Sequence, residues 1–285
     1  MSVNSGVVEL CGSGSPGSEE ATAAASLAAA GVDVLFFFRH GRSYHRRLSS
    51  GILFAGFFKF TERHTAENLK TELLKVVNDW AISNKIVAVV TDNAANIQAA
   101  VRLAGFEHVS CFAHSLNLVV QNALKTTDPL KVKVKHIVEY FHRRTVASEK
   151  LESLQLQMRP DNSPLKLKND VVTRWNSTFY MCNRLCELQE PLEAAIAVLH
   201  NPVVSLSADE RVILKEVSSA LKPFDAVTSE VSAKKSVTIS KVIMLSRGLM
   251  SACQKIQAGL STEQANALMK QLIEGLLDTL RARRN

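Results

Sequence analysis

A single acid, Asp92, directly follows the chain's clearest pattern for a buried strand. Residues 86–90 are five consecutive apolar residues, and Thr91, Asp92, Asn93 and a segment typical of a helix come next. An apolar run bounded by turn formers predicts a strand buried on both faces. Asp92 would then stand at the strand's carboxyl end, where open α/β sheets place their ligand-binding groups. A carboxylate there suits a metal ion, and the alternative is that Asp92 or Asn93 caps the next helix.

Two pairs of side chains with metal-ligand chemistry are each spaced by about one helical turn. Cys111 and His114 form one pair, and Cys182 and Cys186 form the other. One turn puts both members of a pair on one side of a helix, as half of a tetrahedral zinc site requires. Nothing in the sequence brings the two pairs together, so buried thiols and a core histidine are the interpretation we favour over zinc.

Arg174 and Trp175 are adjacent within residues 170–178 (Asp-Val-Val-Thr-Arg-Trp-Asn-Ser-Thr). A guanidinium next to an indole offers a phosphate clamp and a flat face on which an unpaired base could stack. The alternative is that Trp175 belongs to the core while Asn176 or Ser177 caps the helix that follows. The spacing alone favours this core interpretation.

Positive charge is distributed unevenly along the chain, whose net charge is +7. Seven Lys and Arg residues lie between positions 125 and 150 against three acids, and further arginines cluster at positions 39–47 and 281–284. Clustered cations attract the phosphates of a nucleic acid without reading its sequence, and the alternative is a set of solvated helix faces. The candidate contacts in the central cluster are Lys131, Lys133, Lys135, Arg143 and Arg144.

Length and composition narrow the class of protein. A chain of 285 residues with 46% hydrophobic residues can bury a sizeable core, and it contains no apolar run long enough to span a membrane. We therefore expect no membrane partner. Five widely spread cysteines are an odd number, which favours free thiols in a reducing compartment.

Strand and helix patterns alternate in the first part of the chain. Residues 1–30 are rich in Gly, Ser and Ala and predict a flexible tail. Residues 33–60 predict two strands, and a helix with Thr65 as its N-cap follows. Residues 86–90 and 108–110 predict further strands around a helix that ends near Gly105. This order indicates an α/β fold.

Almost all of the chain after residue 112 predicts helices. Ser207 and Glu210 form a capping box at the start of one helix, and Pro223 is expected to kink or end it. Ser261 with Gln264 is the expected cap of the last helix. This part of the chain therefore predicts a helical domain.

Several stretches, in order and spacing, resemble the transposases of the hAT superfamily and, most of all, the animal proteins derived from them that carry BED-type zinc fingers. The resembling stretches are residues 64–68 (His-Thr-Ala-Glu-Asn), 90–96 (Val-Thr-Asp-Asn-Ala-Ala-Asn), 111–118 (Cys-Phe-Ala-His-Ser-Leu-Asn-Leu), 170–177 and 221–225 (Leu-Lys-Pro-Phe-Asp) with Thr228.

The resemblance implies an RNase H-like fold, in which carboxylates bind two divalent ions for phosphodiester cleavage. It predicts an α/β fold class with an incomplete RNase H-like core over residues 31–112 and a large all-helical inserted domain over residues 113–285. Asp92 matches the family's second catalytic acid. Trp175, with Arg174, matches a pair whose indole supports a flipped base in active relatives. Cys111 and His114 match a Cys-Xaa-Xaa-His motif, for which we expect a structural role.

The chain also departs from the family pattern. Asp33 is the only acid between Glu20 and Glu62, and its surroundings do not match those of the first catalytic acid. The chain reaches Asn285 without a match to the third acid, and no BED finger precedes the core. One carboxylate of three cannot align two divalent ions. We therefore expect no transposase or nuclease activity and no cofactor, with the ancestral Mg or Mn lost.

These features together predict a catalytically inactive protein of the nucleus that associates with DNA or chromatin through basic surfaces. A second hypothesis is an interaction module that binds related transposase-derived proteins. A third is a SUMO-ligase-like role, as ascribed to some BED-finger relatives. A fourth is a truncated relic without a selected function.

Overall fold

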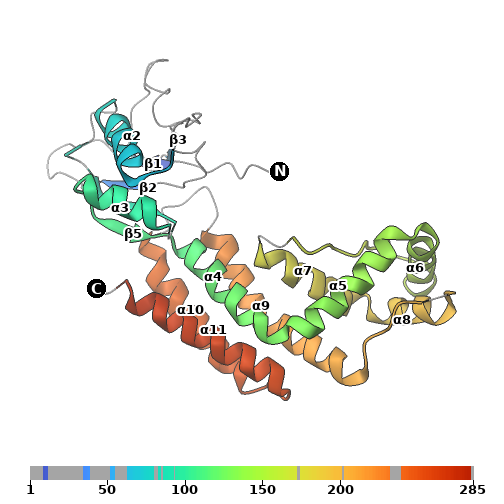
Figure 1. Cartoon of the computed structure of the whole chain (residues 1–285). Helices are drawn as coiled ribbons and strands as arrows, with labels where there is room; N and C mark the ends of the chain where they lie inside the picture. The colour runs from blue at the N-terminus through green and yellow to red at the C-terminus, as the bar shows by residue number, and fades with distance from the viewer. Residues whose placement is uncertain are drawn as a thin grey trace. The chain divides into compact units, whose positions relative to one another are not determined.

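The computed structural model describes residues 9–11, 35–38, 52–54, 63–79, 83–84, 86–92, 94–171, 174–200, 202–231 and 239–283. The chain divides into two compact units. The sheet unit comprises residues 1–115, 231–242 and 283–285, and the helical unit comprises residues 116–230 and 243–282. The described chain is mostly helical, and its strands lie in one sheet (Figure 1).

The sheet has five strands in the order β3-β1-β2-β4-β5. They are β1 (Glu9–Cys11), β2 (Leu35–Phe38), β3 (Ile52–Phe54), β4 (Ile86–Thr91) and β5 (His108–Ser110). The β1–β2 and β4–β5 pairs are parallel, whereas β1–β3 and β2–β4 are antiparallel. The expected strands are thus confirmed at residues 35–38, 52–54, 86–91 and 108–110.

The strand β1 corrects the expectation of a flexible tail over residues 1–30. Leu10 pairs with Phe36 on one side and with Leu53 on the other. The apolar residue between Glu9 and Cys11 thus takes part in the sheet, a long-range pairing that the Gly- and Ser-rich composition around it concealed. The other residues expected in the tail lie outside the described part of the chain.

Two helices of the sheet unit precede and follow β4 in the chain. The helix α2 (Ala66–Asp79) packs on α3 (Ala95–Leu103), and its fully buried stripe contains Leu69, Leu73, Val76 and Val77. Thr65 Oγ1 accepts a hydrogen bond from Asn68 N at 3.3 Å, which confirms the expected N-cap. Gly105 has a φ of 81°, which suits the turn between α3 and β5.

The helical unit is built from a series of helices joined by loops. The helices are α4 (Phe112–Leu124), the 3₁₀ turn η2 (Lys125–Thr127), α5 (Asp128–Arg143), α6 (Thr145–Met158), α7 (Trp175–Glu187), α8 (Gln189–Val198), α9 (Ala208–Val231), α10 (Ile239–Gln257) and α11 (Glu263–Arg281). The ends of α4 and α10 that adjoin residues 115 and 242 belong to the sheet unit. The expected change from strands to helices after residue 112 is confirmed.

One buried core joins α5, α6, α7 and α8 with the start of α9. Ile137, Met181 and Leu188 are among its largest buried side chains, and Leu167 adds an anchor from the loop before α7. The expected capping box is confirmed, because Ser207 N donates to Glu210 Oε2 at 2.7 Å and Glu210 N donates to Ser207 Oγ at 3.2 Å.

Two helix boundaries differ from the sequence expectation. Pro223 lies inside α9, which continues to Val231, and the neighbouring Leu221 and Phe224 are fully buried. Burial of these side chains outweighs the cost of one missing backbone donor. The N-cap of α11 is Thr262, whose hydroxyl accepts from Ala265 N, and not Ser261.

In the described part of the chain, no helix combines the length and apolarity that crossing a membrane requires.

Candidate functional site

Asp92 stands one residue beyond the end of β4, as the strand pattern predicted, and is half-buried. Its Oδ1 accepts a hydrogen bond from Ala94 N at 3.2 Å. The N-cap of α3 is Ala94, which has no side-chain cap bond. Asp92 therefore holds the turn before the helix and does not cap it, so the capping alternative is wrong for this residue. Asn93 lies outside the described residues.

A threonine and a histidine flank Asp92 at this edge of the sheet. Thr91 Oγ1 donates to Asp92 O at 2.9 Å and lies 2.8 Å from His108 Nε2. Because the hydroxyl's one proton is already used, His108 Nε2 is the donor in the second contact. Burial and the nearby Arg102 lower the pKa of His108, although Asp92 and Glu107 oppose them. These contributions together favour the neutral form of the imidazole.

The ligand chemistry needed for a metal is sparse among the described residues. There, no three or more His, Cys, Asp or Glu side chains gather in a group that could hold an ion. Cys111 N donates to Thr91 O at 2.7 Å, and Ser115 Oγ donates to Cys111 O at 3.0 Å. The motif of Cys111 and His114 thus begins α4 directly beside the end of β4.

The second cysteine pair lies in the interior of the helical unit. Cys182 is buried and Cys186 is half-buried. Burial raises the pKa of Cys182 to about 12 and that of Cys186 to about 11. Both thiols therefore keep their protons at neutral pH, unlike the thiolates that bind zinc or attack a substrate.

Trp175 is a core residue of the helical unit and is only 2% exposed. It begins α7, and its ring centroid lies 6.5 Å from that of Phe179. Its indole Nε1 is buried and has no hydrogen-bond partner. A buried ring presents no face to a base, so the base-stacking role predicted for Trp175 is wrong in this structure. Arg174, the adjacent cation, is exposed.

Polar residues of the same motif hold Trp175 in place. Asp170 Oδ1 accepts from Thr178 Oγ1 at 2.7 Å and from Ser177 Oγ at 3.0 Å, which fixes the loop before α7 to its first turn. Asn176 Nδ2 donates at 2.7 Å to Asp225 Oδ1 of α9. This hydrogen bond joins the motif of residues 170–178 to that of residues 221–225, through two residues 49 positions apart. Both motifs thus contribute to the structure of the helical unit.

The five candidate phosphate contacts of α5 and its carboxyl end differ in availability. Lys131 is paired with Asp128, and Lys133 with Glu210, both at 2.6 Å. Arg143 lies 3.4 Å from Glu139 but remains 78% exposed. The Arg144 guanidinium lies over the Tyr140 ring, 4.6 Å from its centroid. Lys135 and Arg144 have no ion pair among the described residues.

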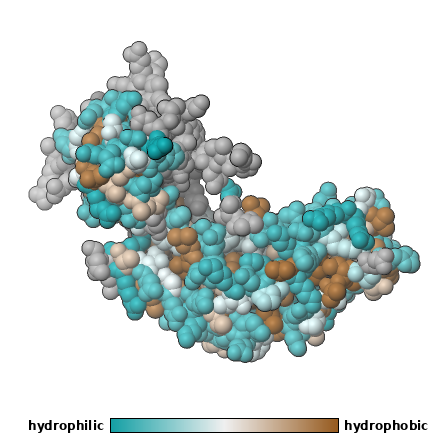
Figure 2. Space-filling view, viewed as in Figure 1, coloured by the Kyte–Doolittle hydropathy of each residue, from teal (hydrophilic) through white to brown (hydrophobic). Residues whose placement is uncertain are grey.

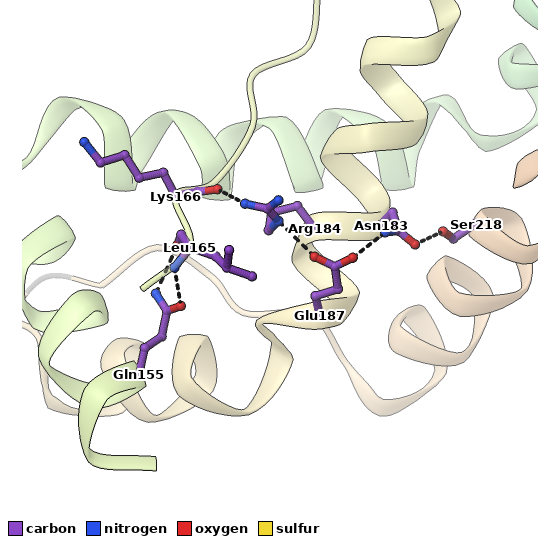
Figure 3. A network of polar contacts seen from close by, with 7 residues as sticks. All are labelled: Gln155, Leu165, Lys166, Asn183, Arg184, Glu187 and Ser218. Carbon is purple, nitrogen blue, oxygen red and sulfur yellow. Dashed lines mark hydrogen bonds and ion pairs between the residues drawn. The ribbon is translucent and has the colours of Figure 1, made fainter. Parts of the chain in front are cut away.

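A set of polar residues that the sequence did not predict fixes the loop between α6 and α7 (Figure 3). Gln155 Nε2 donates to Leu165 O at 3.0 Å, and Gln155 Oε1 accepts from Leu165 N at 2.8 Å. Arg184 Nη1 donates to Lys166 O at 2.7 Å, and Arg184 Nε donates to Glu187 Oε2 at 2.9 Å. The sequence signal for this set was Gln155, a polar residue on the same helical face as Ala147 and Leu151.

Comparison with known proteins places these residues in a family. Residues 109–220, from β5 into α9, match the family model described as the ZBED1 RNase-like helical domain. The human protein "Zinc finger BED domain-containing protein 6" is 30% identical over 203 residues. These matches support a ZBED-like protein derived from hAT transposases. Most of the matched residues thus lie in the helical unit.

The relatives are longer than the part that matches. The match to the human protein covers 66% of this chain and 20% of that protein. The "Putative transcriptional regulator tpeD" of Talaromyces stipitatus is 28% identical over 245 residues, which is 72% of this chain and 29% of that protein. The "Putative AC transposase" of Zea mays is 30% identical over 141 residues, which is 44% of this chain and 17% of that protein. The chain thus spans under a third of these relatives.

Proposed function

We propose that this chain is a catalytically inactive, transposase-derived protein of the nucleus that associates with DNA through the basic surface of its helical unit. One observation carries the proposal, namely that the aromatic residue of the Thr-Arg-Trp motif is buried whereas the arginine beside it is exposed. Trp175, the residue suited to base chemistry, is buried in the scaffold, whereas Arg143, Arg144 and Arg174 are exposed. Such a surface contacts phosphates rather than reacting bases.

The arrangement around Asp92 supports the inactive part of the proposal. We infer that the sheet unit descends from an RNase H-like core in which Asp92 was one of three metal-binding acids. Its carboxylate now accepts from Ala94 N, and its described neighbours are Thr91 and His108. A divalent ion with one carboxylate would not be aligned with a second ion for phosphodiester cleavage. Asp33, whose surroundings do not match those of the first catalytic acid, lies outside the described residues.

The nuclear location rests on the relatives. One relative's name describes a putative transcriptional regulator, and others are BED-type zinc finger proteins. A fluorescent fusion of the chain tests this part, because exclusion of the fusion from the nucleus would contradict it.

The salt dependence of binding to a labelled duplex of about 20 base pairs tests the proposed association with DNA. For each phosphate contact, the logarithm of the affinity falls with the logarithm of the salt concentration with a slope of about −0.9. With about four contacts, the affinity should fall about 100-fold between about 50 and 200 mM salt. Two unrelated duplex sequences should bind with similar affinities, since phosphate contacts carry no base information. Binding that is insensitive to salt, or absent at low salt, contradicts the proposal.

A second candidate is a protein-interaction module, which exposed apolar residues of the helical unit favour. Ile243 and Met244 on α10 are 62% and 75% exposed. Hydrophobic patches also interrupt the mostly hydrophilic visible face of the helical unit (Figure 2). Exposed apolar side chains that adjoin each other fit a protein partner better than a phosphate. Cross-linking to a related transposase-derived protein in the presence of nuclease, with Ile243→Ser as the variant, distinguishes this candidate.

A further inference from the structure

Two basic segments that are distant in sequence meet at one hydrogen bond in the helical unit. His142 Nε2, at the end of α5, donates to Leu167 O at 3.1 Å across 25 residues. Arg143 and Arg144 follow His142 directly, and Lys166 and Lys168 flank Leu167. All four of these cations are exposed, whereas Leu167 is buried in the core. We call Arg143, Arg144, Lys166 and Lys168 the basic ridge.

The loop half of the basic ridge is held in one conformation. Gln155, which is buried, binds both the N–H and the carbonyl of Leu165, and Arg184 binds the carbonyl of Lys166. With the bond from His142, side chains of α5, α6 and α7 together fix the backbone of residues 165–167. In Figure 3 the ammonium of Lys166 extends away from Arg184 and from the rest of this network. A fixed backbone reduces the entropy lost when the lysines bind a ligand.

The charge of the basic ridge is only partly compensated. Arg143 has one loose contact with Glu139, and among the described residues no carboxylate forms an ion pair with Arg144, Lys166 or Lys168. Lys168 instead lies over the Tyr180 ring, 4.8 Å from its centroid, much as Arg144 lies over Tyr140. These contacts help to hold the two cations in place, and both residues remain exposed.

A hollow beside the ridge contains one further acid. Its volume is about 160 Å³, and its lining includes His142, Gln155, Lys166 and one carboxylate, Glu152. Among the described residues, Glu139 is the one carboxylate that forms an ion pair with the ridge, and Glu152 is the one carboxylate in the lining of the hollow. An excess of positive charge on a fixed surface attracts a polyanion, and the attraction strengthens at low salt.

We propose that the basic ridge binds the phosphate backbone of a nucleic acid. Each Arg or Lys contacts a phosphate, whose anionic oxygens accept hydrogen bonds from the N–H groups of the ridge. This inference rests on the proposed function and names the surface that performs it. It adds Lys166 and Lys168, which lie outside the central basic cluster of the sequence, and it leaves out the ion-paired Lys131 and Lys133.

The test compares two charge-matched variants of the full chain with wild type. The ridge variant is Lys166→Glu/Lys168→Glu, and the control is Lys255→Glu/Lys270→Glu, which changes the net charge equally at exposed positions of α10 and α11. Binding to a labelled duplex is measured by fluorescence anisotropy at several salt concentrations. Circular dichroism and Tm establish that both variants are folded.

The ridge variant should bind about tenfold more weakly than wild type at about 100 mM salt, and its logarithmic salt slope should be smaller by about two. The control should keep the wild-type slope and lose affinity by less than about threefold. Equal losses in both variants would contradict the ridge, because affinity would then follow net charge alone, and wild-type affinity in the ridge variant would contradict it as well. If wild type binds no DNA at low salt, the proposed function fails too.

Discussion

Glu216 of α9 clamps the start of α11, and its substitution by glutamine gives a sharp test of the helical unit. Its Oε1 accepts from Ser261 N at 2.7 Å and from Ser261 Oγ at 2.6 Å. Its Oε2 accepts from Thr262 N at 3.0 Å and from Thr262 Oγ1. In Glu216→Gln one carboxylate oxygen becomes an NH₂ group, so one backbone N–H at the helix start loses its acceptor.

The magnitude follows from the pKa of this carboxyl. Burial alone would raise the pKa of Glu216, but the hydrogen bonds from Ser261 and Thr262 outweigh burial and lower it to about 2. The difference from 4.5 sets an upper limit of about 3 kcal/mol, and solvent screening of a partly exposed group reduces it. We expect Glu216→Gln to lower the free energy of unfolding by about 1–2 kcal/mol at pH 7.

The stabilisation by Glu216 should depend on pH in a defined direction. Because the folded pKa lies below the unfolded one, the stabilisation is fully present above about pH 5.5 and is lost as the pH falls toward 2. Urea unfolding of wild type and Glu216→Gln, followed by circular dichroism, should therefore show a stability difference that shrinks by about half or more at pH 3. Glu274→Gln, at an exposed position of α11, removes the same charge and should stay within about 0.5 kcal/mol of wild type. A difference that is absent at pH 7, or unchanged at pH 3, would show that the Glu216 carboxylate does not stabilise the start of α11 in this way.

Further substitutions test the packing. Gly275→Ala places a Cβ 2.9 Å from Val119 Cγ1 and should lower the unfolding free energy by about 1–3 kcal/mol. In Gly248→Ala the new Cβ meets nothing within 4 Å, and the substitution should raise the unfolding free energy by about 0.5–1 kcal/mol. A change of the same sign for both variants in urea unfolding would contradict this difference in packing. Trp175→Ala should cost about 3–5 kcal/mol in the same assay, and a near-neutral result would show that the indole is not core. Gln155→Ala unpairs two backbone groups, so it should cost about 1–3 kcal/mol and speed amide exchange in residues 165–167; unchanged exchange there would contradict the clamp.

Features set by nearby residues were predictable from the sequence. The buried strand before Asp92 needs only its own apolar run, the N-cap Thr65 needs only the next three residues, and the capping box of Ser207 and Glu210 is equally local. The structure confirms all three. Local side-chain preferences decide these features before any tertiary contact forms.

Features set by distant residues were not predictable. Ser261 looked like the N-cap of α11, but Glu216 from a helix 45 residues earlier takes its donors, and Thr262 becomes the cap. Lys133 looked free to bind phosphate, yet Glu210 pairs with it across 77 residues. The spacing around Trp175 favoured a core ring, but the adjacent Arg174 left base stacking open, because burial depends on which helices pack over the ring.

We propose that this transposase-derived chain associates with DNA without cutting it. The most direct test places wild type and Asp92→Asn side by side on a DNA hairpin substrate with Mg²⁺ or Mn²⁺, and records both binding and strand cleavage. Both proteins should bind with the same salt dependence and neither should cleave, because the described residues contain no group of three metal-ligating side chains that could help to align two ions. Metal-dependent cleavage by wild type that Asp92→Asn abolishes would contradict this proposal.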